Sequence, residues 1–244
     1  LGVQAMSLSL DGSTAAHHDG VRQVPGTFDA TLRALADANE VGMPMQINTL
    51  VTDTTVADLD DTYELLKGYE LFQWSLFFLI SVGRGAQREM SPGDAERTLI
   101  KWNRRRPDAP FRIKTTEAMQ YRRIAAQQML RAGRTEQEIL DSPASRGFGI
   151  RDGNGIMFIS HLGEVMPSGF LPMSVGSVRE HSIVELYRDT ELMRALRRPD
   201  GFKGDCGLCE FNKWCGGSRS RAYAWTGDPL ESDPLCPYKP AEAR

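Results

Sequence analysis

The sequence predicts an α/β protein in which helices cover a parallel sheet, followed by a small cysteine-rich segment. Two observations support this fold class. In the first half of the chain, short apolar runs typical of strands alternate with amphipathic segments typical of helices, and this alternation favours a parallel sheet. All four cysteines of the 244 residues lie at or after Cys206.

Four segments have the apolar composition of buried strands. The predicted strands are Ala5–Leu10, Met45–Val51, Leu71–Ile80 and Phe111–Lys114. The segments between them carry apolar residues at helical spacing, with capping residues before them and glycine after them. The predicted helices begin at Thr27, at Thr54 or Thr55, at Ser91-Pro92 and at Thr116, and the first two end at Gly42 and Gly68.

Three strand–helix units do not close a barrel. They suit either an open sheet or half of a six- or eight-strand barrel. The strand Ala5–Leu10 would then have an exposed edge, which natural sheets generally avoid. Because the chain also begins with Leu1 and not with methionine, we expect it to be a fragment that begins inside a domain. Processing of the N-terminus is the alternative explanation of a first residue other than methionine.

The second half of the chain is less regular. A weak helix is predicted near Thr135–Leu140, and Ser142–Gly155 is rich in glycine, serine and arginine, as is typical of a linker or mobile loop. The runs Ile156–Ser160 and Glu164–Met166 predict a β-hairpin, and a last helix is predicted over Ser182–Leu196. We therefore expect one domain over residues 1–141 and a second over residues 142–244.

Composition narrows the possible partners. The net charge is −3, which gives no reason to expect nucleic acid or an anionic membrane as a partner. The longest apolar run, Leu76–Ile80, is far shorter than the roughly 20 residues of a membrane span. Clustered cysteines favour metal binding, and free thiolates favour a reducing cytoplasm. His17 and His18 show no metal spacing and are expected at the surface.

The cysteine spacing is Cys206-x2-Cys209-x5-Cys215-x20-Cys236. Four thiolates suit either tetrahedral zinc or a cubane iron–sulfur cluster. Zinc ribbons usually show two close pairs, which the second half of this pattern lacks, and Arg219 and Arg221 add positive charge beside an anionic site. The spacing therefore favours a cluster, with zinc as the alternative.

The segment Gly204–Ala224, followed by Gly227-Asp228 and by Asp233–Tyr238, resembles the auxiliary-cluster extension of radical SAM enzymes. This extension is the SPASM or twitch-type C-terminal domain. The cysteine spacing, the Gly216-Gly217 pair, the arginines and the trailing Asp-Pro-x-Cys all agree with its pattern. The resemblance implies that the four cysteines bind one auxiliary [4Fe–4S] cluster.

The front half of the chain is similar to the same family. Ser7–Gly12, Gln46–Val51 and Leu79–Gly85 resemble its fourth, fifth and sixth barrel strands. The resemblance implies the C-terminal half of a partial (β/α)6 barrel, whose front three strand–helix units are absent, followed by the small cysteine-rich extension. It also implies S-adenosyl-L-methionine (SAM) as a cofactor.

Four residues are candidates for contact with SAM. Ser9 and Asp11 lie at the carboxyl end of a strand, where parallel α/β folds place ligands, and are implied to face the SAM ribose. Turn formation by Asp-Gly is the alternative reading. Asn48 is a polar residue in the middle of an apolar strand and is predicted to face a ligand. Arg84 is placed near the SAM carboxylate, or else in a plain loop.

Two departures from the family pattern matter. The family's radical cluster is held by Cys-x3-Cys-x2-Cys, which this chain does not contain, so the chain alone is expected to be inactive. Relatives with two auxiliary clusters carry a cysteine after the hairpin proline, whereas Ser168 follows Pro167 here. One auxiliary cluster is therefore expected, not two.

The resemblance implies that the full-length parent is a cytoplasmic radical SAM oxidoreductase of haem-pathway or peptide-maturation type. A second [4Fe–4S] cluster in the parent would cleave SAM to a 5′-deoxyadenosyl radical, which abstracts hydrogen from a small-molecule or peptide substrate. A ferredoxin or flavodoxin is the expected electron donor, and no catalytic side chain is predicted. The residues alone leave two alternatives: a zinc-binding interaction module and an iron–sulfur protein that only transfers electrons.

Overall fold

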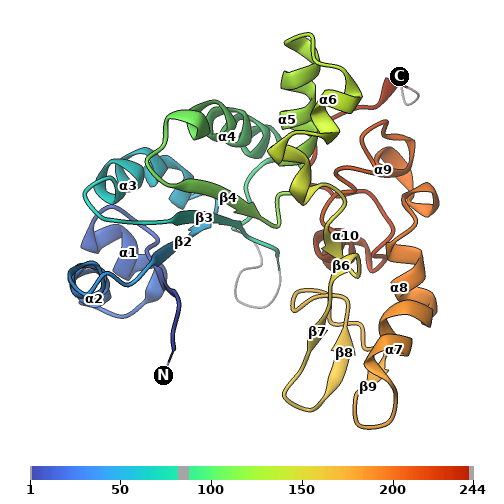
Figure 1. Cartoon of the computed structure of the whole chain (residues 1–244), viewed down its shortest axis with the longest axis horizontal. Helices are drawn as coiled ribbons and strands as arrows, with labels where there is room; N and C mark the ends of the chain where they lie inside the picture. Colours follow the sequence, from blue (N-terminus) through green and yellow to red (C-terminus); the bar gives the residue numbers. More distant parts are fainter. Residues whose placement is uncertain (1, 82–87, 242–244) are drawn as a thin grey trace. The chain divides into compact units, whose positions relative to one another are not determined.

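The computed structural model describes residues 2–81 and 88–241, which divide into two compact units (Figure 1). The first unit contains the described residues within 1–79, 85–91 and 101–117. The second contains those within 80–84, 92–100 and 118–244. The first holds the parallel sheet, and the second holds all four cysteines.

The first unit is built on a four-stranded sheet. Its strands are β1 (Met6–Ser9), β2 (Met45–Val51), β3 (Gln73–Phe78) and β4 (Arg112–Thr116). Their order in the sheet is β1-β2-β3-β4, and every neighbouring pair is parallel. The predicted α/β class with a parallel sheet is thus confirmed, and all four predicted strands are present.

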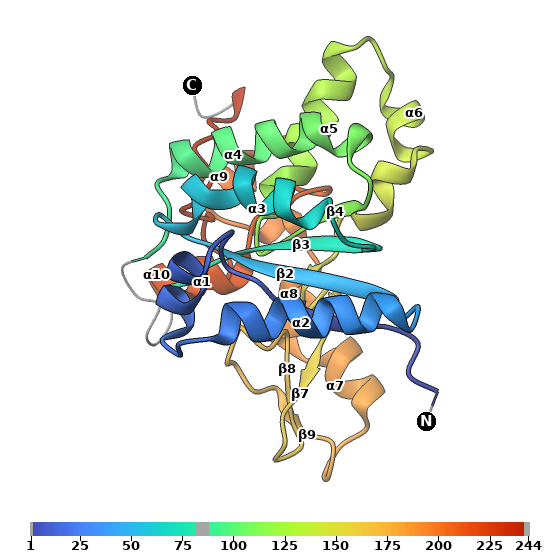
Figure 2. The ribbon, with the colours of Figure 1, turned by 90° about the vertical axis from the view of Figure 1, so that its left-hand side faces the viewer.

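Helices form the crossover connections between these strands. After β1 come α1 (Ala15–Arg22) and α2 (Thr27–Glu40), and Figure 2 shows α2 running alongside β2. After β2 come the 3-10 helix η1 (Thr55–Asp58) and α3 (Leu59–Leu66). After β3 comes α4 (Pro92–Arg105), and the 3-10 helix η3 (Arg106–Asp108) leads into β4.

One face of the sheet forms the core of the first unit. The register places Leu8, Ile47, Trp74 and Ile113 in one row across the four strands. Trp74 is fully buried, its ring meets Trp102 of α4 edge-on at 4.9 Å, and its indole N–H donates to Thr49 Oγ1 at 2.8 Å. Burying such a side chain contributes about 1.5–3 kcal/mol or more, so this face anchors the helices.

The opposite face of the same sheet is polar. The next register row is Ser9, Asn48, Ser75 and Lys114. Gln73 Nε2 donates to Gln46 Oε1 at 2.6 Å and to Ser75 Oγ at 2.9 Å, and Gln46 Nε2 donates to Asn48 Oδ1 at 2.6 Å. Strand residues alternate between faces, so one strand pattern serves both a core and a polar surface.

The turn after β1 differs from the sequence-based expectation. Residues 15–22 form α1, and Thr14 caps this helix by accepting from the His17 N–H. His17 is exposed as expected, but His18 is 1% exposed and its Nδ1 accepts the Asp11 N–H at 2.9 Å. The expected surface position of His18 is therefore wrong, since its ring provides the acceptor for a buried backbone donor.

The second unit begins with α5 (Gln120–Arg131) and α6 (Glu136–Leu140). Thr135 and Glu138 form a capping box at the start of α6. The strand pairs that follow are β5 (Arg151–Asp152) with β6 (Gly155–Ile156), and β7 (Phe158–Ile159) with β8 (Glu164–Met166) and β9 (Gly176–Ser177). The antiparallel pairing of β7 with β8 confirms the predicted hairpin.

The rest of the second unit is made of short helices. They are η4 (Pro143–Gly147), α7 (Ile183–Asp189), α8 (Glu191–Leu196), η5 (Pro199–Gly201), α9 (Gly204–Leu208) and α10 (Arg219–Thr226). The predicted helix over Ser182–Leu196 is divided at Thr190, whose backbone is extended. Within the two described ranges, no helix has the length and hydropathy that crossing a membrane requires.

The burial of His18 predicts a pH-dependent stability. Burial lowers the pKa of His18, against the opposing effect of nearby Asp11. Because the unfolded chain then binds a proton more readily, the unfolding free energy should fall as pH drops below about 6.5, by about 1.4 kcal/mol per unit of pKa difference. Urea unfolding between about pH 7.5 and 5 measures this loss.

A matched variant isolates the histidine. His18→Asn keeps an acceptor for the Asp11 N–H but does not titrate, so its unfolding free energy should depend less on pH over the same range. An identical pH slope in the two proteins would show that His18 does not cause the effect.

Candidate metal centre

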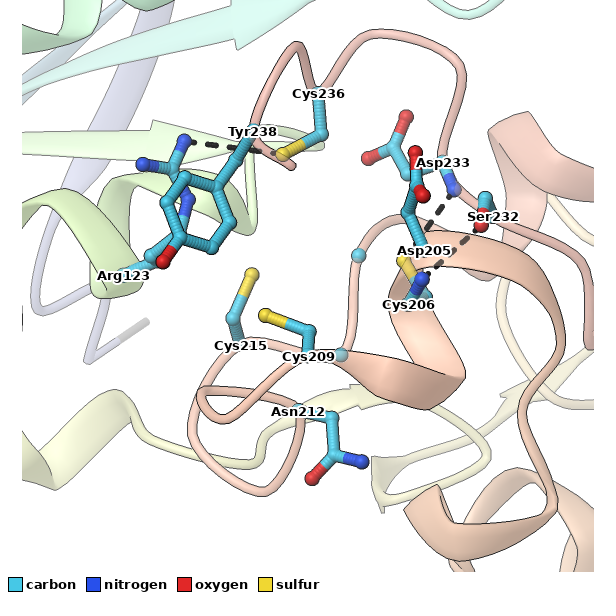
Figure 3. Close-up of a pocket in the computed structure, with 12 residues that line it drawn as sticks. Arg123, Asp205, Cys206, Cys209, Asn212, Cys215, Ser232, Asp233, Cys236 and Tyr238 are labelled. Carbon is cyan, nitrogen blue, oxygen red and sulfur yellow. Dashed lines mark hydrogen bonds between the residues drawn. The ribbon is translucent and has the colours of Figure 1, made fainter. Parts of the chain in front are cut away.

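All four cysteines line one cavity in the second unit (Figure 3). Cys206 lies on α9 and Cys209 directly follows that helix. Cys215 lies in the next loop and is buried, whereas the other three are partly buried. Cys236 reaches the cavity from the C-terminal loop, and Figure 3 shows it on the side opposite Cys209 and Cys215. The distant fourth cysteine of the sequence pattern therefore joins the other three.

Glycines allow the backbone to pass close to the sulfurs. Gly216 and Gly217 have φ angles of 71° and 64°, in the left-handed region that favours glycine. A Cβ at Gly217 would lie 3.1 Å from Cys206 Sγ and 2.6 Å from Arg219 Nη2. In α9, a Cβ at Gly207 would lie 2.1 Å from the Phe202 carbonyl oxygen. Only glycine at position 217 allows the backbone to pass this close to Cys206 Sγ.

Hydrogen-bond donors surround the sulfurs. Cys206 Sγ lies 3.5 Å from both Arg219 Nη2 and the Asp233 backbone N–H. Cys236 Sγ lies 3.7 Å from Arg123 Nη2. Backbone N–H groups two residues further along the chain donate to Cys209, Cys215 and Cys236. Every one of the four sulfurs therefore has a donor, which is the environment that thiolate ligands of a metal centre need.

Four arginines near the cavity are almost completely buried. They are Arg123, Arg151, Arg219 and Arg221, each 1% exposed or less. Buried carboxylates accompany them: Asp233 Oδ1 lies 3.5 Å from Arg221 Nη1, and Asp152 Oδ2 accepts the Ser220 N–H at 2.9 Å. Burial of a guanidinium is costly without compensating negative charge, so this part of the fold is prepared for an anionic group.

Sequence reasoning found only part of this set. It singled out Arg219 and Arg221, which lie close to the cysteines in sequence, but not Arg123, Arg151 or Asp152. The last two occupy β5, inside the segment predicted to be a linker, and both are 1% exposed. The prediction of a linker over Ser142–Gly155 is wrong there, because its glycines and serines flank a buried ionic strand.

Burial favours the protonated form of three of the four thiols when no metal is bound. Burial raises the pKa of Cys209 to about 11 and the pKa values of Cys215 and Cys236 to about 12. Burial likewise lowers the pKa of Arg151 to about 10, and the charge of Arg219 adds to that effect. A metal centre would have to displace the thiol protons, so its binding releases protons and strengthens as pH rises.

The donor set of four cysteine sulfurs around one cavity suits a cubane cluster or a tetrahedral zinc ion. In the part of the chain that the structure describes, no three His, Cys, Asp or Glu side chains are close enough together to hold one metal ion. Four sulfurs on one zinc ion would lie within about 4 Å of one another, given a Zn–S distance of about 2.3 Å. A cubane holds its four thiolate ligands further apart, around a larger centre.

Three of the four candidate SAM contacts, Ser9, Asp11 and Asn48, lie in the first unit. Ser9 and Asn48 are register partners on β1 and β2, so the structure brings these two together on the polar face of the sheet. Asp11 is 2% exposed: its Oδ1 accepts the Leu50 N–H at 2.7 Å, and its Oδ2 lies 2.6 Å from Arg22 Nη2. Arg84 lies outside the described residues. Contact of these residues with SAM stays a prediction.

Ser168 occupies the position where relatives with two auxiliary clusters were expected to carry a cysteine. Its Oγ lies 3.2 Å from Ser220 Oγ and accepts the Phe170 N–H at 3.2 Å. The side chain is 6% exposed and does not line the cavity of the four cysteines. Its contacts are those of a turn residue packed on α10.

Similarity searches identify relatives along nearly the whole chain, although no protein-family model matches it. The chain is 38% identical to the AdoMet-dependent heme synthase of Methanosarcina barkeri, over 99% of this chain and 69% of the relative. It is 35% identical to that of Nitratidesulfovibrio vulgaris, over 98% and 66%. It is 26% identical to the pre-heme d1 synthase of Dinoroseobacter shibae, over 99% and 63%. The chain thus spans about two thirds of these relatives' lengths.

Solved structures show a similar fold. Streptococcus suis SuiB superposes with a TM-score of 0.65 at 16% identity, over 95% of this chain and 54% of SuiB. The AdoMet-bound enzyme anSMEcpe superposes with a TM-score of 0.60 at 17% identity, over 94% of this chain and 62% of that chain. At such low identity these likenesses concern the fold alone.

Cys236→Ala and Ser168→Ala should differ in metal content. Cys236→Ala opens one corner of the site, so the reconstituted variant should lose much of its iron or become oxygen-sensitive. Ser168→Ala removes a hydroxyl that does not line the cavity, so iron content should stay full. Iron and sulfide analysis after anaerobic reconstitution measures both variants. Equal retention of iron would show that Cys236 is not the fourth ligand.

Proposed function

The chain belongs to the radical SAM family, and from this premise we propose that it supplies the auxiliary-cluster part of a radical SAM oxidoreductase. The single observation that carries the proposal is the cavity lined by Cys206, Cys209, Cys215 and Cys236. In this proposal the second unit is a SPASM or twitch-type extension with one auxiliary [4Fe–4S] cluster. The sheet of the first unit is part of a (β/α)6 barrel.

The residues of the second unit would act by holding and insulating the cluster. The four thiolates would ligate it, and the donors of Arg123, Arg219 and the backbone would stabilise their negative charge. When bound, such a cluster carries one electron or ligates a substrate. The buried arginines would place fixed positive charge near the thiolates, and their burial strengthens this attraction.

The residues of the first unit would bind SAM and substrate. On the polar face of the sheet, Ser9 and Asn48 are register partners and offer a hydroxyl and an amide group to a ligand. The apolar core face offers no such groups. Radical SAM chemistry consists of hydrogen abstraction from the substrate by a radical derived from SAM. In the proposed whole enzyme, SAM and a further [4Fe–4S] cluster supply that radical, and a ferredoxin or flavodoxin supplies the electron.

A haem precursor is the substrate class that the relatives favour. Three AdoMet-dependent heme synthases share 33–38% identity with this chain. The peptide-maturing relatives are more distant: the mycofactocin maturase MftC of Mycobacterium tuberculosis is 26% identical over 95% of this chain. We therefore propose a tetrapyrrole substrate, with peptide modification as the less favoured class.

Metal analysis tests the proposed cofactor. After anaerobic preparation, iron and acid-labile sulfide should each amount to about four per chain, because a cubane needs four of both. The protein should be brown, with broad absorption from thiolate-ligated iron. A colourless protein with one zinc and no sulfide would instead identify a zinc-binding module.

A second test concerns SAM cleavage by the 244-residue chain itself. The chain contains four cysteines, all in the proposed auxiliary site, and therefore none for a Cys-x3-Cys-x2-Cys cluster. We expect no 5′-deoxyadenosine when the purified chain is incubated with SAM and dithionite. Chromatographic detection of 5′-deoxyadenosine above a protein-free control would contradict this expectation.

A further inference from the structure

Arg123 of α5 lies beside the cavity in an unusual charge environment (Figure 3). Its side chain is almost fully buried, with 1% of the residue exposed. Its Nη2 lies 3.7 Å from Cys236 Sγ, and its guanidinium lies 4.7 Å from the centre of the Tyr238 ring. Arg123 is thus held against a cysteine that is separated from it by more than a hundred residues.

A carboxylate holds the other side of the same guanidinium. Glu96 of α4 accepts from Nη1 at 3.0 Å and from Nη2 at 2.5 Å, and Gln127 Oε1 accepts from Nη1 at 2.9 Å. This two-point pairing fixes the orientation of the guanidinium plane. Glu96 is more accessible, with 21% of its side chain exposed. The carboxylate therefore fixes the direction in which Arg123 Nη2 faces the sulfur.

Arg123 keeps one donor without an acceptor. Its Nε is buried and makes no hydrogen bond to any described residue. A buried donor left unpaired costs about 1–3 kcal/mol, so native structures rarely keep one without a reason. An acceptor that arrives with the cofactor would remove this cost.

We propose that Arg123 is a positioning residue that raises the reduction potential of the auxiliary cluster through the Cys236 thiolate, and that Glu96 opposes it. This inference rests on the proposed function of the cavity. Reduction transfers one electron from an external low-potential donor, such as dithionite, to the cluster, so the reduced site carries one more negative charge than the oxidised site. A fixed cation nearby stabilises the reduced state more, and a fixed anion stabilises it less.

The test is the midpoint potential of the anaerobically reconstituted chain, measured by redox titration followed in the visible spectrum and by EPR. Arg123→Gln should lower the potential by at least about 59 mV, which is a tenfold change in a one-electron equilibrium. Arg123→Lys keeps the charge and should recover most of this loss. Glu96→Gln removes the opposing anion and should shift the potential upward.

Two further variants keep the test decisive. Arg131→Gln removes the same charge from an exposed position on the same helix and should leave the potential unchanged. The double variant Glu96→Gln/Arg123→Gln leaves no unpaired carboxylate. Its midpoint potential should be at least about 59 mV lower than that of Glu96→Gln, which is again a tenfold change in the one-electron equilibrium constant. These two comparisons separate a local effect from a change in net charge or in folding.

Each outcome decides between the two proposals. If the wild-type chain holds no four-iron cluster, the proposed function fails. If the cluster assembles in the wild type and in Arg123→Gln with the same potential, this inference alone is overturned. If Arg123→Gln and the double variant both fail to assemble a cluster while Arg123→Lys assembles one, the charge of Arg123 serves cluster assembly and not the reduction potential. That outcome also overturns this inference.

Discussion

Charge compensation around buried sulfur is the constraint on which the second unit depends. Four cysteine side chains line one cavity together with Arg123, and three further arginines that are almost fully buried lie nearby. Burial raises the pKa values of three of the thiols to about 11 or 12, so these thiols carry no negative charge at neutral pH when no metal is bound. Ligated thiolates would balance the guanidinium charges, so metal binding and the stability of this unit should be coupled.

This constraint explains features that look unrelated in the sequence. Asp233 is 2% exposed because it accepts the Ser218 and Leu235 N–H groups while facing Arg221, and it thereby fixes the loop that carries Cys236. The irregular backbone of this region, with left-handed Gly217 close to Cys206 Sγ, follows from the same need to bring backbone donors to sulfur. Few regular elements are possible where so many polar groups converge on one point.

The first unit meets a different requirement, because one sheet has to provide both a core and a polar surface. Its strands and helices could be predicted from residue pattern, since apolar residues at strand and helix spacing must be buried against something. The buried position of His18 could not be predicted, because it depends on a hydrogen bond to the Asp11 N–H that forms only when α1 folds back on the turn.

The sequence by itself determined the alternation of strands and helices and the hairpin, because the spacing of apolar residues fixes which face of an element is buried. It also determined the four cysteines as one set, because the chain contains no other thiols. Only the tertiary structure decided which charges surround those thiols. Arg123 reaches the cavity from α5 and is paired with Glu96 of α4. Arg151 and Asp152 are buried on a two-residue strand, where Asp152 accepts the Ser220 N–H. Their roles follow from distances in space, which no local pattern encodes, since an arginine on a helix is usually a solvated residue until packing buries it.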